Sequence, residues 1–235
     1  MSGRAPAIKP SIASKLMARG RKLAAKTEGN DRLSQIFYVA SQLFCEQGFD
    51  ATSMSNIADA VGVTKAAIYH FVPGGKKDLL YAIIAYGMDT VQEAVVTPAS
   101  AVNDAEQRLR TIIINHAKLV MGGSTAKGFN PVTITSDEVA ALSPAHRRII
   151  NQRKRAYMDF VRATLEHLGG ERKLKDLDVA VLAFSVIGMI VWLGHWYRPN
   201  GRLTSDQVAE TICTAILGGI LREDSRPASQ DAGME

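Results

Sequence analysis

Residues 52–71 read TSMSNIADAVGVTKAAIYHF and have the spacing of a helix-turn-helix. Two short helices that cross steeply need apolar anchors, a small residue where they touch, and a residue that tolerates positive φ in the turn. Counted from Met54, all seven positions fit these requirements: Ile57, Ala58, Val61, Gly62, Val63, Ile68 and Phe71. Thr64 can cap the second helix, and Thr52 or Ser53 the first. An ordinary helical hairpin is the alternative, and the complete set favours the helix-turn-helix.

Helical periodicity continues on both sides of this stretch. Upstream, apolar residues from residue 33 to 44 recur at the spacing of one helix face, and Gly48 is placed to end that helix. Downstream, the pattern predicts helices over 79–96, stopped by Thr97-Pro98, and over 109–121, 144–168, 179–195 and 205–220. Ser143-Pro144 is a strong helix start. There is no β-alternating run, so the predicted fold class is all-α.

Composition excludes several classes of protein. The chain has 235 residues, of which 46% are hydrophobic and 22% charged, as in globular domains. Its two cysteines, Cys45 and Cys213, cannot form a disulfide scaffold or a four-ligand zinc site, which favours a reducing compartment. The apolar run 179–193 is shorter than the ~20 residues that span a bilayer, so it predicts a buried helix and no membrane partner. Being apolar nearly all round, it should be covered on more than one side.

The positive charge is concentrated at the start of the chain. Residues 1–30 carry net +6, whereas the remainder carries −1. Such a basic arm can contact phosphate or an anionic surface, or it can be a solvated tail that aids solubility. Its Arg-rich, acid-poor character also resembles an organelle transit peptide, an interpretation that applies only to a eukaryotic source.

The motif of residues 52–71, followed by Lys76, Lys77 and Leu79-Leu80, resembles the TetR family of bacterial transcriptional regulators. The resemblance covers residues 33 to about 80. It implies a three-helix DNA-binding domain, here 31–80, and a larger helical ligand-binding and dimerisation domain, here 81–221. Residues 1–30 then form a flexible arm and 222–235 a disordered tail.

Two features depart from the family pattern. The link 72–75 looks one residue longer than usual, which leaves open whether Lys76 or Lys77 meets a DNA phosphate. Residues 31–80 also hold four basic against five acidic residues, fewer positive charges than such a domain usually has.

The second helix of the motif is expected to enter the major groove of an inverted-repeat, double-stranded DNA operator. Lys65 can donate to guanine and Ala66 can touch a thymine methyl, while Thr64 and Tyr69 can reach phosphates. The complete set of expected DNA contacts is Thr52, Ser53, Thr64, Lys65, Ala66, Tyr69, His70, Lys76 and Lys77. The arm 1–30 should raise affinity without setting specificity, and its deletion should flatten the salt dependence of binding.

A looser resemblance lies in residues 196–204, WYRPNGRLT, which are similar to the acyl-CoA-responsive branch of the family. The alternative is that this turn only sets the angle between two dimer-interface helices. An apolar and aromatic set suits a small hydrophobic effector, and arginines could hold its phosphates. The expected ligand-binding residues are Met88, Val91, Ile113, Phe184, Trp192, Trp196, Arg147 and Arg153.

The sequence therefore predicts a cytoplasmic, homodimeric repressor that a small ligand, such as an acyl-CoA, releases from DNA. The last two helices are expected to form the dimer interface. No catalytic set, metal-ligand cluster or cofactor motif is found, so an enzyme is not expected. Two alternatives stay open: a ligand-independent architectural DNA binder, and a helical ligand-binding domain without DNA function.

Overall fold

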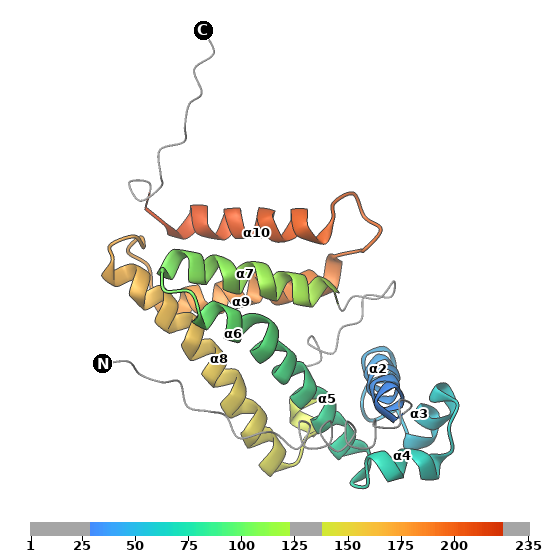
Figure 1. Ribbon diagram of the computed structural model, residues 1–235. Helices are drawn as coiled ribbons and strands as arrows, with labels where there is room; N and C mark the ends of the chain where they lie inside the picture. The colour runs from blue at the N-terminus through green and yellow to red at the C-terminus, as the bar shows by residue number, and fades with distance from the viewer. Residues whose placement is uncertain (1–28, 123–137, 223–235) are drawn as a thin grey trace.

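The computed structural model describes residues 29–122 and 138–222, and these residues are almost entirely helical (Figure 1). The elements in chain order are α2 (Gly29–Gln47), α3 (Met54–Val61), α4 (Lys65–Phe71), α5 (Gly75–Val91), the π-helical segment η1 (Gln92–Val96), α6 (Thr97–Ser100), α7 (Ala105–Gly122), the 3₁₀ turn η3 (Glu138–Ala141), α8 (Pro144–Gly170), α9 (Val179–Trp196) and α10 (Ser205–Ile220). The described residues contain no strand beyond an isolated bridge between Leu174 and Leu221. The predicted all-α class is confirmed. The predicted arm and tail lie almost wholly outside the described residues.

Helices α2, α3 and α4 form a small bundle at one end of the molecule (Figure 1). Ile57 and Ile68 are fully buried at the crossing of α3 and α4, and Ala58 is the small buried residue beside them. Gly62 ends α3 at φ 75°, the left-handed conformation that the turn requires. Val63 and Phe71, also expected as anchors, are only partly buried against the same core. The helix-turn-helix predicted for residues 52–71 is therefore confirmed.

Helix α5 connects two hydrophobic cores. Its first part, from Leu79 to Ala85, belongs to the core of α2–α4, and Val91 belongs to the core of the larger bundle. The smaller core also includes Val139 from η3, Leu142 from the η3–α8 connection and Ile150 from α8. The predicted division after residue 80 thus falls inside a continuous helix that both cores share.

The prediction that Thr97-Pro98 ends the helix from residue 79 is wrong. The chain stays helical through Ser100 because η1 adopts π-helical turns immediately before the proline. In this segment the Thr97 N–H donates to the carbonyl of Gln92, five residues back. Pro98 has no N–H for the carbonyl of Ala94, and the side chain of Asn115 on α7 donates to that oxygen instead, at 3.0 Å. A partner from another helix therefore satisfies the carbonyl that the proline leaves free.

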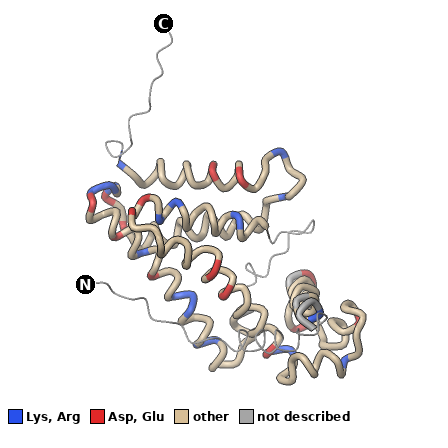
Figure 2. Tube along the Cα trace, viewed as in Figure 1, with Lys and Arg blue, Asp and Glu red and all other residues tan. Residues whose placement is uncertain are grey.

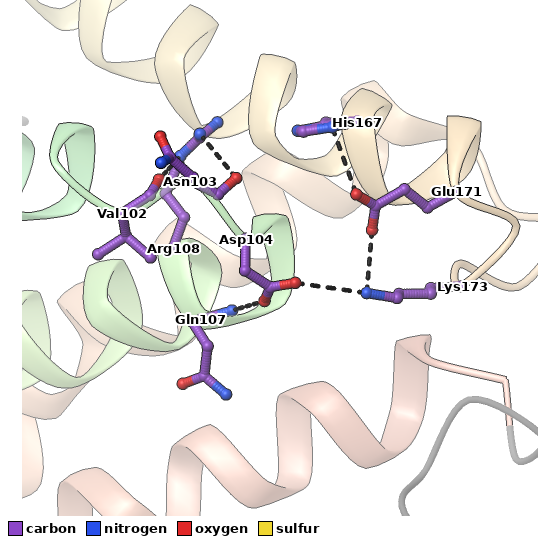
Figure 3. A network of polar contacts seen from close by, with 8 residues as sticks. All are labelled: Val102, Asn103, Asp104, Gln107, Arg108, His167, Glu171 and Lys173. Atoms are coloured by element: carbon purple, nitrogen blue, oxygen red, sulfur yellow. Dashed lines mark hydrogen bonds and ion pairs between the residues drawn. The ribbon is translucent and has the colours of Figure 1, made fainter.

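The larger bundle consists of α7–α10 and is tied together at one end by a polar network (Figure 3). Lys173, in the α8–α9 loop, lies 3.0 Å from Glu171 and 3.5 Å from Asp104, which precedes α7. Asp104 also accepts the backbone N–H of Gln107 at 2.8 Å. This backbone hydrogen bond, followed by the nearby Lys173 ammonium, holds the pKa of Asp104 below its usual value. The network joins the start of α7 to the end of α8.

One face of α9 is not covered by the rest of the chain. Its exposed apolar side chains are Val181, Phe184, Met189, Trp192 and Trp196. Phe184 is 66% exposed and Trp192 60% exposed, unusual values for such large apolar groups. The expectation that this helix is covered on more than one side is therefore not met within a single chain. By length and composition α9 and the α5–α6 helix could cross a membrane, although over half of the α5–α6 window is buried inside the protein.

Candidate nucleic-acid interface and effector region

Helix α4 presents an exposed face at the end of the small bundle. Lys65, Ala66, Tyr69 and His70 all lie on the surface of this helix. They share a face because residues three and four positions apart are neighbours on a helix. Figure 2 shows few basic positions in α2–α4. Lys65 is the one cation within α3 and α4, so any base-specific charged contact from these two helices falls to it.

The two predicted N-cap hydroxyls differ in what they can still donate. Thr64 Oγ1 accepts the N–H of Ala67 at 3.2 Å, and its hydroxyl proton has no acceptor among the described residues. Ser53 Oγ accepts the N–H of Asn56, but it also donates to Asn56 Oδ1. Thr64 can therefore donate to a phosphate while it caps α4, whereas the Ser53 donor is already engaged within its capping box.

Thr52, expected at the DNA surface, lies in the interior. Its side chain is 1% exposed, and its hydroxyl lies 2.9 Å from the carbonyl oxygen of Gly48 and 3.2 Å from that of Leu43. Leu43 lies near the end of α2 and Gly48 directly follows it, where the chain leaves the helix and backbone carbonyls need partners from outside it. Thr52 thus closes α2, and its burial corrects the expectation of a DNA contact.

The two lysines at the start of α5 have different surroundings. Lys76 Nζ donates to the backbone carbonyls of Phe49 at 2.7 Å and Asp50 at 3.2 Å. The same ammonium lies 4.4 Å from the centroid of the Phe49 ring. Lys77 is exposed, and the structure describes no hydrogen bond or ion pair for it. Lys76 is therefore bound to the α2–α3 connection, which leaves Lys77 as the lysine available to a phosphate.

An arginine on α8 joins the larger bundle to α5. Arg153 Nη2 lies 2.6 Å from Asp89 Oδ1, and its Nη1 donates to the carbonyl of Ala85 at 3.2 Å. Only a tenth of the Arg153 side chain is exposed. Arg147 donates to the carbonyls of Ala140 and Leu142, which precede α8. Both arginines expected to hold ligand phosphates thus have partners inside the chain, and Arg153 is too enclosed to meet a phosphate from solvent.

A second contact joins α5 and α8 closer to the DNA-binding helices. The ring of His146 stacks on Tyr81 at 3.9 Å between centroids, and its Nδ1 lies 3.8 Å from Asp78 Oδ1. Burial raises the pKa of the Tyr81 hydroxyl. Among the described residues, His146 Nδ1 is the one enclosed side-chain polar atom without a hydrogen-bond partner. Local sequence patterns do not predict this junction, because Tyr81 and His146 are 65 residues apart in the chain.

The structure divides the expected ligand-binding residues into two groups. Val91 and Ile113 are buried in the larger core, and Met88 packs partly buried against the smaller one. Phe184, Trp192 and Trp196 are on the exposed face of α9, where the Trp192 ring stacks on His195 at 4.2 Å. One chain therefore does not gather them around a common site. Sequence reasoning also missed a hydrogen bond between His116 and Tyr157 in the larger bundle.

Comparisons with known proteins agree with this architecture over most of the chain. The profile described as "Bacterial regulatory proteins, tetR family" matches residues 36–83. The profile "Tetracyclin repressor-like, C-terminal domain" matches residues 102–220, half of the chain. The chain belongs to the TetR family. The predicted resemblance is thereby confirmed in both domains.

Several TetR-family regulators are similar along nearly their whole length. The transcriptional repressor KstR2 of Mycobacterium tuberculosis is 25% identical over 200 residues, covering 83% of this chain and 95% of KstR2. AibR, solved in complex with isovaleryl coenzyme A and operator DNA, is 33% identical, with a TM-score of 0.69, and the match covers 78% of this chain and 97% of AibR. The KstR2 structure has a TM-score of 0.73 at 22% identity, with 82% of this chain and 96% of KstR2 covered, and supports the fold. This TetR-family protein is a ligand-responsive, DNA-binding transcriptional regulator.

Proposed function

We propose that this regulator is a cytoplasmic homodimeric repressor that an acyl-CoA thioester releases from an inverted-repeat operator. The exposed face of α4 supports the DNA-binding part, because Lys65, Ala66 and Tyr69 face solvent there while the buried side of the helix fixes its position. The AibR complex with isovaleryl coenzyme A supports the choice of ligand class. The domain division at residues 30, 80 and 221 is part of the same proposal.

The uncovered face of α9 supports the dimer. Contiguous exposed apolar patches mark interaction surfaces, and the five large side chains of this face recur along one side of a single helix. A second copy of α9 and α10 would cover them in a four-helix arrangement with twofold symmetry. Phe184, Trp192 and Trp196 are thus assigned to the interface rather than to a pocket within one chain.

Sedimentation of single variants tests the dimer. Trp192→Glu places a charge on the uncovered face and should shift the protein toward monomer at micromolar concentration. Ile149→Glu is the control, because Ile149 is exposed on α8, away from that face. A wild-type monomer, or equal effects of the two variants, contradicts the proposed interface.

Gel shift with the protein's own upstream DNA tests operator recognition. If Lys65 contacts a base, Lys65→Ala should cost about 1–3 kcal/mol on the operator and relax the preference at one base step. Loss of the same size on random DNA would make Lys65 a phosphate contact. Binding to every sequence alike by the wild type would favour an architectural DNA binder instead.

Titration of the operator complex tests the effector. Isovaleryl-CoA, free isovalerate and CoA are compared, and the half-saturating operator concentration is measured at each. We expect the thioester to weaken operator binding while the other two do not. Tighter binding with the thioester would make the protein a co-repressed or activated regulator, and no response to any thioester would discard the CoA hypothesis.

A further inference from the structure

A polar pair lies at the edge of the larger apolar core. His116 on α7 is 3% exposed, and its Nδ1 lies 3.0 Å from the hydroxyl of Tyr157 on α8. The two rings meet edge to face at 5.4 Å between centroids. His116 has fully buried apolar neighbours one turn away on its own helix, Ile112, Ile113 and Val120. Tyr157 is only partly buried against the same core, so the pair lies where the larger core meets the surface of α8.

Counting protons shows that the pair keeps an unused donor. Burial lowers the pKa of His116 to about 4, so the imidazole is neutral at pH 7 and carries one N–H. Tyr157 contributes one O–H, and burial raises its pKa. The hydrogen bond between them uses one of these two protons, whichever tautomer is present. The other, on His116 Nε2 or on Tyr157 Oη, has no further acceptor among the described residues.

Apart from the enclosed His146 Nδ1 between α5 and α8, the other buried polar side chains in the described part of the chain are satisfied. The hydroxyl of Ser41 donates to the carbonyl of Phe37, that of Thr52 to Gly48, and that of Thr164 to Phe160. In each case the one hydroxyl proton is donated to a backbone carbonyl. The His116–Tyr157 pair differs because its remaining donor is held in apolar surroundings, where an unmade hydrogen bond is costly.

We infer that the His116–Tyr157 pair is the polar anchor of the effector site and donates to an uncharged carbonyl oxygen of an apolar ligand. This inference rests on the proposed function and adds a basis for selectivity. A thioester carbonyl accepts the donor without bringing a charge into the core. An ionised carboxylate would enter apolar surroundings beside a pair that carries no positive charge to offset its desolvation. The pair therefore selects thioesters over the corresponding free acids.

The test removes the carbonyl from the ligand and the donors from the protein. The ligands are isovaleryl-CoA and S-(3-methylbutyl)-CoA, a thioether of the same shape without the carbonyl oxygen. The double variant His116→Leu/Tyr157→Phe replaces both partners by apolar groups, so neither residue keeps an unpaired polar atom. The readout is the ligand concentration that half-releases the operator, with operator affinity in the absence of ligand reporting the fold.

In the wild type we expect the thioester to act at about tenfold lower concentration than the thioether, the value of one neutral hydrogen bond. The double variant should respond to both ligands alike. His116→Leu and Tyr157→Phe alone each keep one donor and should retain part of the preference. This pattern distinguishes a donor from a packing contact.

Thr164→Val is the matched control, since it removes a buried hydroxyl two turns along α8 whose donor is already used. It should keep the tenfold preference. The inference is overturned if the double variant keeps the wild-type ratio, or if the wild type does not distinguish the two ligands. Failure of every CoA compound to change operator binding overturns the proposed effector class itself, a separate result.

Discussion

The neighbouring lysines Lys76 and Lys77 provide a matched pair of substitutions. Each change to methionine removes one positive charge at the start of α5. Lys76→Met also removes the ammonium that donates to the carbonyls of Phe49 and Asp50 and lies over the Phe49 ring. Lys77→Met removes no contact that the structure describes. Lys76→Met should therefore lower stability, whereas Lys77→Met should weaken DNA binding.

The expected magnitudes follow from these contacts. Hydrogen bonds to a charged group contribute about 1.5–3 kcal/mol, and a partly exposed cation–π contact adds about 0.5–1 kcal/mol. Because Lys76 is only partly buried, we expect Lys76→Met to lower the free energy of unfolding by about 2 kcal/mol. For a protein of this size that lowers Tm by roughly 4–8 °C if unfolding is cooperative. Lys77→Met should leave Tm within about 1–2 °C, as surface substitutions do.

DNA binding should show the opposite order. If Lys77 meets a phosphate, its loss weakens binding on all sequences and reduces the salt slope by about 1. Lys76→Met, measured well below its Tm, should keep the wild-type salt slope. Thermal unfolding and salt-dependent gel shift, measured on both variants, show which lysine stabilises the fold and which contacts a phosphate. A stable Lys76→Met protein with a reduced slope would refute the assignment of Lys76 to the α2–α3 connection.

Three further predictions concern the junctions and the buried histidine. Arg153→Leu should lower the free energy of unfolding by about 3 kcal/mol in denaturant titration, because the partly buried Asp89 carboxylate loses its ion pair with Arg153. Arg155→Leu is the control: Arg155 is exposed, so this change should alter stability by less than about 0.5 kcal/mol. Asn115→Ala should lower the free energy of unfolding by about 1 kcal/mol, because the Ala94 carbonyl loses its donor. The loss should be smaller in a Pro98→Ala background, where the N–H of residue 98 is available to that carbonyl. If the effects of the two substitutions simply add, Asn115 does not substitute for the missing N–H of Pro98. His116 has its folded pKa lowered to about 4, so the unfolded chain binds more protons between pH 6.5 and 4, and stability on the order of 3 kcal/mol present above pH 6.5 should be lost across that window. Unfolding curves of His116→Leu/Tyr157→Phe should lack that loss, and equal pH dependence would show that His116 does not titrate as described.

Local signals predicted the helices well because they act within one or two turns. Thr64, Ser143 and Thr204 each cap a helix as expected, and Gly62 takes the positive φ that the turn needs. The error at Pro98 has a long-range cause. The carbonyl freed by the proline is satisfied by a residue 21 positions away, and no local pattern contains that information.

The site could be predicted only in part for the same reason. The exposed face of α4 follows from helical spacing, but the burial of Thr52 and the attachment of Lys76 depend on where α2 ends relative to α5. Spacing cannot distinguish Lys76 from Lys77, since both lie in the same turn. Aromatic residues on α9 look the same in sequence whether they face a pocket or a second copy of the chain.

The change in operator occupancy sets the binding free energy that the effector must contribute. Moving a two-state equilibrium from 1:99 to 99:1 takes about 5.5 kcal/mol of differential binding. One hydrogen bond from the His116–Tyr157 pair supplies about 1 kcal/mol, so most of the energy has to come from apolar contact. The remaining energy of about 4.5 kcal/mol corresponds to about 180 Å² of apolar surface that is buried in one state only, or roughly two leucine-sized groups.

An isovaleryl chain offers about one such group, so it should be a weak effector unless the CoA moiety itself discriminates between the two states. Longer or ring-bearing acyl-CoAs should then release the operator at progressively lower concentration, because each added group brings more apolar surface. A titration series of thioesters of increasing acyl size measures this dependence. Equal potency across the series would place the driving energy in contacts to CoA and would direct attention to Arg148 and Arg155, which are exposed on one side of α8.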